Sequence, residues 1–224
     1  VSALVQKTTG QRVLDFLRPR LFDPLGIENP TWERCPRGID TGGWGLSVRT
    51  ADIARFGQLY LRQGIWDGRR LLPEGWTDDA TRIHVANGNP ADPSDWSQGY
   101  GFQFWRCRHG AYRGDGAFGQ YCVVFPQHDA VLAITSGLGD MQAVLNLVWE
   151  RLLPAFRPSA LPRDPAAEKA LRARCASLSL PADDGAAAND TARRISGATF
   201  AFPENDQKVE RLRLAFDARG AILT

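Results

Sequence analysis

Apolar positions recur at helical spacing in three parts of the chain. The first stripe covers residues 1–22, and Thr9-Gly10 interrupts it, which predicts two helices there. The same spacing follows a cap at Ser47 or Thr50, and it returns after a cap at Asp140. The sequence therefore predicts helices at the start, in the middle and at the end of roughly the first 155 residues.

Strand-like segments precede the last of these helices. Residues 100–107 alternate apolar and polar side chains, and residues 120–125 and 130–135 are continuous apolar runs. Short connections join them, so we expect adjacent antiparallel strands. Helices before a meander of strands, with one helix after it, predict an α+β fold in which helices pack on an antiparallel sheet.

The composition changes after residue 156, and the chain is expected to have three parts. A linker rich in Ala, Pro and Asp contains one short surface helix near residues 166–174 and no hydrophobic period over residues 183–190. The last part alternates like strands around a turn at residues 217–220, which predicts the start of an accessory β-domain. The three predicted parts are residues 1–156, 157–193 and 194–224.

Both ends of the chain suggest a larger protein. The helical pattern begins at once, with no initiator Met, and a terminal hairpin is marginal by itself in water. We therefore expect a fragment of a longer polypeptide.

The composition excludes several classes of function. The 224 residues are 43% apolar and 23% charged, which is typical of a soluble globular protein, and no apolar run is long enough to predict a transmembrane helix. The net charge is only +2 and basic residues are scattered, which argues against nucleic-acid binding. The four cysteines form no Cys-x-x-Cys pair and the three histidines are isolated, so we expect no metal site and no cofactor.

The segment most suggestive of chemistry is glycine-rich and leads into a buried strand. Gly114, Gly116 and Gly119 fall within a few residues of one another, which lets a backbone lie close to another group. Two interpretations are open. The segment is either a bulged hairpin, or an edge strand that lines a cleft and points a backbone N–H at a developing oxyanion.

Further segments occur in a familiar order. A Pro24-Leu-Gly-Ile27 turn is followed by Thr41-Gly-Gly-Trp-Gly-Leu46 before a capped helix, and Phe118-Gly-Gln-Tyr121 comes about 70 residues later. Over roughly residues 1–155 this order resembles the serine β-lactamase-like family, which includes class C β-lactamases, penicillin-binding esterases and 6-aminohexanoate-dimer hydrolases. The resemblance is to the C-terminal half of that catalytic domain.

The resemblance implies a fold and a mechanism. An antiparallel sheet packs against a helical region, and the active site lies between them. A serine in Ser-x-x-Lys forms an acyl-enzyme, while that lysine and a tyrosine of Tyr-x-Asn move protons. A third motif, typically Lys-Thr-Gly or a variant with His or Trp, lies on an edge strand of the sheet.

This sequence departs from that pattern in two of the three motifs. No serine has a lysine three residues later, and no tyrosine has an asparagine two residues later. The third motif matches Tyr112-Arg113-Gly114, or Ala111-Tyr112-Arg113 if the register is one residue earlier. In the first register, the resemblance places an oxyanion-hole N–H on Asp115.

The resemblance also implies roles for the neighbouring residues. Arg113 replaces or adjoins the usual cation and can hold a substrate carboxylate, while Tyr112, Gly114 and Gly116 line the substrate. Trp44 lies in the glycine-rich loop, where it either walls the cleft or packs in the core. Arg113 has the alternative of a solvated edge charge, and Asp115 that of a turn residue.

The leading hypothesis is therefore part of a serine hydrolase that cleaves small ester or amide substrates, with β-lactams and D-amino peptides as candidates. Without its nucleophile this chain is expected to be inert alone. The alternative is a non-catalytic ligand-binding module or a structural, oligomerising module of the same fold. An incomplete sheet exposes an unpaired edge, so we expect self-association or pairing with a missing N-terminal part.

Overall fold

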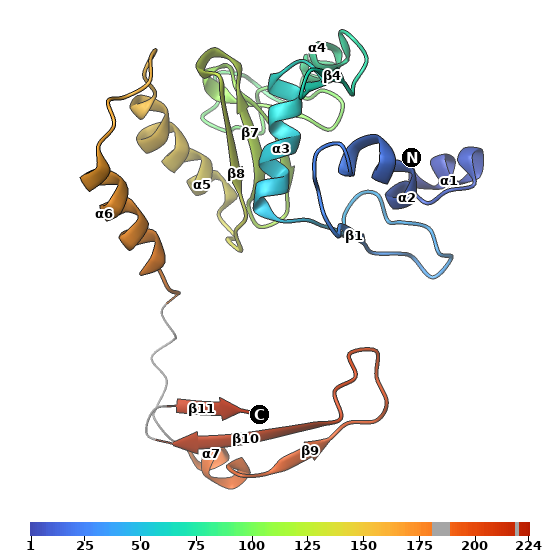
Figure 1. Ribbon diagram of the computed structural model, residues 1–224, viewed down its shortest axis with the longest axis vertical. Helices are drawn as coiled ribbons and strands as arrows, with labels where there is room; N and C mark the ends of the chain where they lie inside the picture. Colours follow the sequence, from blue (N-terminus) through green and yellow to red (C-terminus); the bar gives the residue numbers. More distant parts are fainter. Residues whose placement is uncertain (181–188, 218–219) are drawn as a thin grey trace. The chain divides into compact units, whose positions relative to one another are not determined.

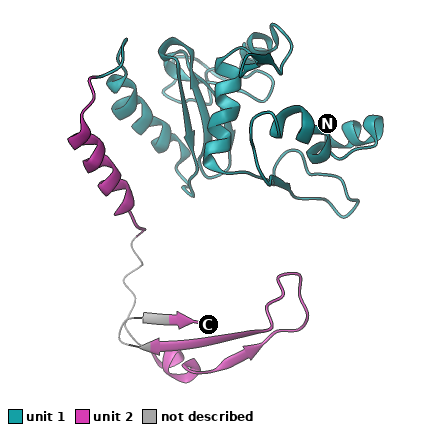
Figure 2. Cartoon of the chain, in the orientation of Figure 1, with its two compact units in different colours: residues 1–161 teal, residues 162–224 magenta. Residues whose placement is uncertain are grey.

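The computed structural model describes residues 1–180, 189–217 and 220–224. These residues form two compact units, Val1–Leu161 and Pro162–Thr224 (Figure 2). The expected boundaries after residues 156 and 193 stay predictions. Most of the expected structureless segment at 183–190, and the centre of the turn at 217–220, lie outside the described residues.

The first unit begins with the two predicted helices. Helix α1 (Ser2–Thr9) ends at Gly10, whose φ of 71° is left-handed and suits glycine. Helix α2 (Val13–Leu17) continues into a wide turn, Arg18–Phe22. Two short strands, β1 (Thr31–Trp32) and β2 (Leu46–Ser47), then pair antiparallel and close the loop between them. An apolar cluster holds this region to helix α3 (Thr50–Leu61): Leu14, Phe22, Leu25, Ile27 and Leu59.

A four-stranded antiparallel sheet forms the centre of the first unit (Figure 1). Its order along the sheet is β5 (Trp105–Arg106), β6 (Tyr112–Gly116), β7 (Gln120–Phe125) and β8 (Ala130–Ile134). The predicted strand over residues 100–107 is mostly wrong. Gln103 takes a left-handed φ of 62°, so the chain turns back on itself and only the last residues enter the sheet.

Helices cover both faces of this sheet, so the predicted α+β fold is confirmed. Helix α3 (Thr50–Leu61) lies against β7 and β8, and helix α5 (Met141–Leu147) with its continuation Val148–Leu152 packs on the opposite face. Successive strand residues serve the two layers, because Val123 packs with α5 and Val124 packs with the α3 side. At Gly57 a Cβ atom would lie 2.5 Å from Val131 Cγ1, so glycine permits the close helix–sheet contact.

The predicted N-cap residue is confirmed for helix α5 and wrong for helix α3. Asp140 accepts a hydrogen bond from Ala143 N–H at 3.0 Å, as predicted for helix α5. Neither Ser47 nor Thr50 caps α3. Arg49 is the N-cap residue instead, and its N–H donates to the Asp52 carboxylate at 3.0 Å.

Short elements complete the two units. The first unit also contains a hairpin of β3 (Ile65–Trp66) and β4 (Arg69–Arg70), helix α4 (Trp76–Thr81), and single turns at Arg108–Gly110, Pro126–His128 and Leu153–Ala155. The second unit consists of α6 (Pro165–Ala176), α7 (Asp190–Ile195) and a sheet in the order β11 (Gly220–Leu223), β10 (Arg211–Asp217), β9 (Thr199–Ala201). The predicted surface helix near residues 166–174 is confirmed as α6, which has no buried residue. Within the described ranges, no helix has the length and apolarity needed to cross a bilayer.

A buried carboxylate fixes the long loop before the sheet. Asp95 has no exposed side-chain surface and accepts hydrogen bonds from Arg108, Gln142 and Trp149 at 2.7–3.2 Å. Burial raises the pKa of Asp95, but the hydrogen bonds that Arg108, Trp149 and Gln142 donate to the ionised form outweigh it, so the pKa lies below its usual range. One carboxylate therefore ties the loop to the β5–β6 turn and to helix α5.

We predict that Asp95→Ala lowers the free energy of unfolding by about 3 kcal/mol, because it leaves the Arg108 charge and the Trp149 N–H without their partner. Chemical denaturation measures the change. Asp92→Ala is the matched control, since Asp92 is an exposed carboxylate three residues earlier in the same loop. Equal stability of the two variants would contradict the role given to Asp95.

We also predict which thiols react. Burial raises the pKa of Cys107 to about 11 and that of Cys122 to about 12, and the two lie in layers on opposite faces of the sheet. Ellman's reagent at pH 8 should therefore modify exposed Cys175 and, more slowly, half-buried Cys35. All four thiols should react in guanidinium. Fast reaction of Cys107 or Cys122 in the native protein would show that these layers are open.

Candidate active site

Strand β6 is paired along only part of one edge. Strand β5 pairs with it at Tyr112 and Arg113, whereas β7 pairs along its whole length. Within the described sheet, no strand covers the outer edge of β6 from Gly114 to Gly116. The unpaired segment is thus the glycine-rich one singled out from the sequence.

Backbone alternation decides which groups face this open edge. Cys107 N–H donates to Ala111 C=O at 2.9 Å, so the polar groups of Ala111 point toward β5. In an extended strand the N–H and C=O of alternate residues point to the same side. Arg113 therefore directs its backbone groups to β5, and Asp115 directs its N–H and C=O to the open edge.

The three glycines have different structural causes. Gly119 has a φ of 85° in the β6–β7 turn, and a Cβ there would lie 2.3 Å from Ser136 Oγ, so the fold requires glycine. A Cβ on Gly116 would be tight, at 3.2 Å from the Cβ of Gln120. At Gly114 the nearest atom would be the Cβ of Cys122 at 3.9 Å, which is ordinary contact. The fold alone therefore gives no steric reason for glycine at position 114.

Arg113 lies under this edge, fully buried. Its Nε and Nη2 donate to Asp115 Oδ2 at 3.1 and 2.9 Å, and its Nη1 donates to the Asp95 carbonyl at 2.9 Å and to Cys107 Sγ at 3.3 Å. Its guanidinium carbon also lies 4.5 Å from the centre of the Trp96 ring. Four of the five N–H donors of Arg113 are thus occupied inside the protein, and its role as a substrate ligand stays a prediction.

Asp115 is the partly exposed member of the ion pair with Arg113. Its side chain is 11% exposed. Burial raises the pKa of Asp115, and the charge and hydrogen bonds of Arg113 reduce that rise without cancelling it. The unpaired segment of β6 therefore lies next to an ion pair, in which Asp115 neutralises the charge of Arg113, and not next to a free cation.

The other two predicted site residues make their contacts away from the unpaired segment of β6. Tyr112 is buried on the α3 side against Phe104, with ring centres 5.6 Å apart, and burial raises its pKa. Trp44 is 69% exposed, and its carbonyl accepts hydrogen bonds from Trp32 and Thr41. Among the described residues, no hydrogen bond joins Trp44 to β6. The substrate-binding roles of Tyr112, Gly114, Gly116 and Trp44 stay predictions.

Tyr100 and Gln103 lie near these residues and were not among the predicted site residues. The Tyr100 ring lies against Trp105, with centres 4.6 Å apart, and its hydroxyl donates to Gln103 Oε1 at 3.1 Å. Burial raises the pKa of Tyr100, and the negative charge of Asp115 adds to the effect. A strand was predicted over these residues, so the turn that brings Tyr100 to the site left no separate signal in the pattern.

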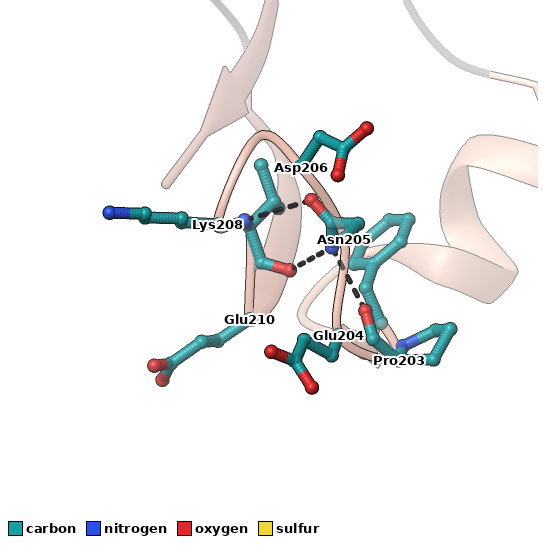
Figure 3. A pocket seen from close by; sticks show the side chains of 8 residues that line it. Pro203, Glu204, Asn205, Asp206, Lys208 and Glu210 are labelled. Carbon is teal, nitrogen blue, oxygen red and sulfur yellow. Dashed lines mark hydrogen bonds between the residues drawn. The ribbon is translucent and has the colours of Figure 1, made fainter. Parts of the chain in front are cut away.

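The second unit has a cavity of about 730 Å³. Its charged side chains do not point toward a common centre (Figure 3). It lies within the Phe202–Glu210 loop, which Asn205 ties together by hydrogen bonds to the carbonyls of Pro203 and Val209 (Figure 3). Asp206 and Lys208 point in different directions from this loop. No group of three His, Cys, Asp or Glu residues in the described part of the chain could hold a metal ion.

Comparisons with known proteins point to one family. A sequence profile described as Beta-lactamase matches residues 1–147. The 6-aminohexanoate-dimer hydrolase of Paenarthrobacter ureafaciens is 26% identical over 143 residues, which is 61% of this chain and 36% of that protein. Penicillin-binding protein 4 of Amycolatopsis lactamdurans is 26% identical over 206 residues, which is 71% of this chain and 53% of that protein. The chain thus spans about a third to a half of these curated relatives.

Solved structures support the same fold. A putative 6-aminohexanoate-dimer hydrolase from Bacillus anthracis matches with a TM-score of 0.56 and 22% identity, over 70% of this chain and 42% of that one. A β-lactamase from Mycobacterium bovis matches with a TM-score of 0.51 and 19% identity, over 66% and 60% of the two chains. These structures show the shared fold, and the profile match over residues 1–147 shows that the chain belongs to the Beta-lactamase family.

Proposed function

We propose that this chain is the sheet-bearing part of a serine hydrolase that cleaves an ester or amide bond through an acyl-enzyme. The open edge of β6 at Gly114–Gly116 is the observation that supports the proposal most. A strand edge with unpaired donors can bind an extended substrate backbone, and a free N–H there can stabilise a tetrahedral oxyanion. Membership of the family supports hydrolysis of a small molecule.

In this proposal the residues of β6 have different roles. The Asp115 N–H donates to the oxyanion, and Gly114 leaves the α3 face of the strand bare, so that a substrate and a nucleophile can approach the backbone. Arg113 holds Asp115 in place and adds positive potential beneath the edge. The Arg113 guanidinium can reach a substrate carboxylate only if it exchanges its bonds to Asp115.

The covalent step needs groups that the 224 residues do not contain. A serine hydroxyl adds to the carbonyl carbon, its proton passes through a base to the departing alcohol or amine, and water later releases the acyl group. The sequence has neither Ser-x-x-Lys nor Tyr-x-Asn. We infer that polypeptide beyond these residues supplies both motifs, and that β-lactams, D-amino peptides and small esters are the substrates to screen.

The test is the intact mass of the natively expressed protein before and after treatment with a fluorophosphonate probe. We expect one adduct on a serine outside these 224 residues, and none on the 224-residue chain treated in the same way. An adduct within the chain would refute its proposed inertness. Absence of any adduct on the natively expressed protein would favour a non-catalytic module.

A variant of β6 links the labelling to the proposed edge. Gly114→Ala should slow fluorophosphonate labelling at least about tenfold, because the added methyl crowds the approach to the oxyanion site. The fold has room for that methyl, so the unfolding midpoint should not fall. Gly137→Ala is the matched control, since a Cβ there meets no atom within 4 Å. If fluorophosphonate labels both variants at the same rate, β6 has no part in the mechanism.

The partner that we propose is another strand at the other edge of the sheet. Strand β8 ends the described sheet and carries only Ala130, Val131, Leu132, Ala133 and Ile134, without a charge or proline to discourage pairing. The 224-residue chain should therefore self-associate, and sedimentation velocity across a range of concentrations should show it. A monomer at high concentration would contradict this expectation.

A further inference from the structure

The first unit contains a small polar cavity that none of the steps proposed above uses. Its volume is about 190 Å³, which is room for several water molecules or for one small organic molecule. Helix α3 contributes Tyr60 to the lining, helix α4 contributes Thr77 and Asp78, and strands β5 and β6 contribute Arg106 and Tyr112. Polar side chains from four elements thus surround one space.

Two charged side chains of this lining do not neutralise each other. Arg106 is half-buried and donates hydrogen bonds to the carbonyls of Thr81 and Gly110, at 3.2 and 3.5 Å. Asp78 is exposed, and its Oδ1 accepts from Gln63 Nε2 at 3.3 Å. Within the described part of the chain, neither Arg106 nor Asp78 belongs to an ion pair. One cation and one carboxylate therefore remain to be matched by a ligand.

Two buried tyrosine hydroxyls add donors to the lining. The Tyr60 oxygen accepts from Trp76 Nε1 at 3.2 Å, so its own proton is available to another acceptor. Tyr112 is only 5% exposed, and among the described residues its hydroxyl has no hydrogen-bond partner. Burial raises the pKa of both tyrosines, so both hydroxyls stay protonated near neutral pH. A buried hydroxyl without a partner costs free energy, which a ligand with an acceptor group can recover.

The two charges lie around the Tyr112 side chain. Burial is the largest influence on the pKa of Tyr112, and the charges of Arg106 and Asp78 act on the same group in opposite directions. The guanidinium carbon of Arg106 lies 5.8 Å from the centre of the Tyr112 ring. A cation, a carboxylate and a neutral donor therefore share one small cavity.

We propose that this cavity binds a small zwitterion, an amino acid with one carboxylate and one ammonium group. The carboxylate pairs with Arg106 and accepts from the Tyr112 hydroxyl, and the ammonium group donates to Asp78. The two ligand charges and the two protein charges sum to zero, so no charge is left without a partner. The small volume excludes amino acids with bulky side chains. This inference concerns binding alone and does not rest on the proposed hydrolysis.

Saturation-transfer NMR with the natively expressed protein tests the inference. The probes are glycine, β-alanine and 4-aminobutyrate, which carry the two charges at increasing separation. We expect saturable binding of at least one of them, and at least about tenfold weaker binding of acetate and methylammonium, which carry one charge each. The inference is overturned if no zwitterion binds saturably, or if acetate binds as tightly as the best zwitterion.

Three variants locate the ligand in this cavity. Arg106→Gln and Asp78→Asn each remove one charge, and each should weaken binding of the best zwitterion at least about tenfold. Tyr112→Phe removes only a hydroxyl that has no partner in the protein. It should therefore weaken binding about threefold or more without lowering the unfolding midpoint.

Matched substitutions outside the cavity serve as controls. Arg69→Gln, Asp92→Asn and Tyr121→Phe make the same chemical changes at residues that do not line the cavity, and Tyr121 packs on the α5 side of the sheet. These three variants should bind the zwitterion as the unchanged protein does. If Arg106→Gln, Asp78→Asn and Tyr112→Phe also leave binding unchanged, the zwitterion binds elsewhere and the assignment of this cavity is wrong, whatever the outcome of fluorophosphonate labelling.

Discussion

The buried charges of Arg113 and Asp95 are the constraint on which the first unit depends. A guanidinium with no exposed surface must find partners for its donors, and Arg113 finds them in Asp115, the Asp95 carbonyl and Cys107. The Asp95 carboxylate in turn holds the β5–β6 turn and helix α5. Loop, sheet and helix thus meet at one ionic cluster.

The two faces of β6 differ, and the ionic cluster lies on one of them. On the α5 side, side chains fill the space: Arg113 lies among Trp96, Trp105 and Tyr121, at 4.5 to 5.8 Å from the ring centres. On the α3 side, only Tyr112 carries a side chain, and the strand then continues as Gly114 and Gly116. A rigid strand that is bare on one face and unpaired along one edge is well suited to bind an extended substrate, because its backbone groups are already oriented.

Asp115 has one role in packing, through its side chain, and a second role in the proposed chemistry, through its backbone. Its carboxylate pairs with Arg113 inside the protein, whereas its backbone N–H points to the open edge. The side chain therefore fixes the strand conformation that aims the N–H. The turn that follows is held in the same way, because Ser136 donates hydrogen bonds to the carbonyls of Phe118 and Gly119 at 2.8 Å. Hydrogen bonds of Arg113 thus hold β6 at Asp115, and those of Ser136 hold the turn after it.

The sequence by itself determined the α+β class, the order of the main helices and of the strands β7 and β8 in the first unit, and the glycine-rich strand as the candidate site. Periodicity, caps such as Asp140 and turn glycines act within a few neighbouring residues, so they can be recognised from the chain alone. The family was also recognisable, because short segments kept their order and spacing.

Only the tertiary structure decided what the side chains do. Arg113 could be a substrate ligand or an edge charge in the sequence, and its burial depends on Asp95, which is distant along the chain and lies in a loop without any pattern. The turn at Gln103, the contact of Tyr100 with Trp105 and the cavity beside Tyr112 likewise join segments far apart in sequence. Local patterns record which face of a strand is buried, but long-range packing selects the partners, and these partners decide which donors stay free for chemistry.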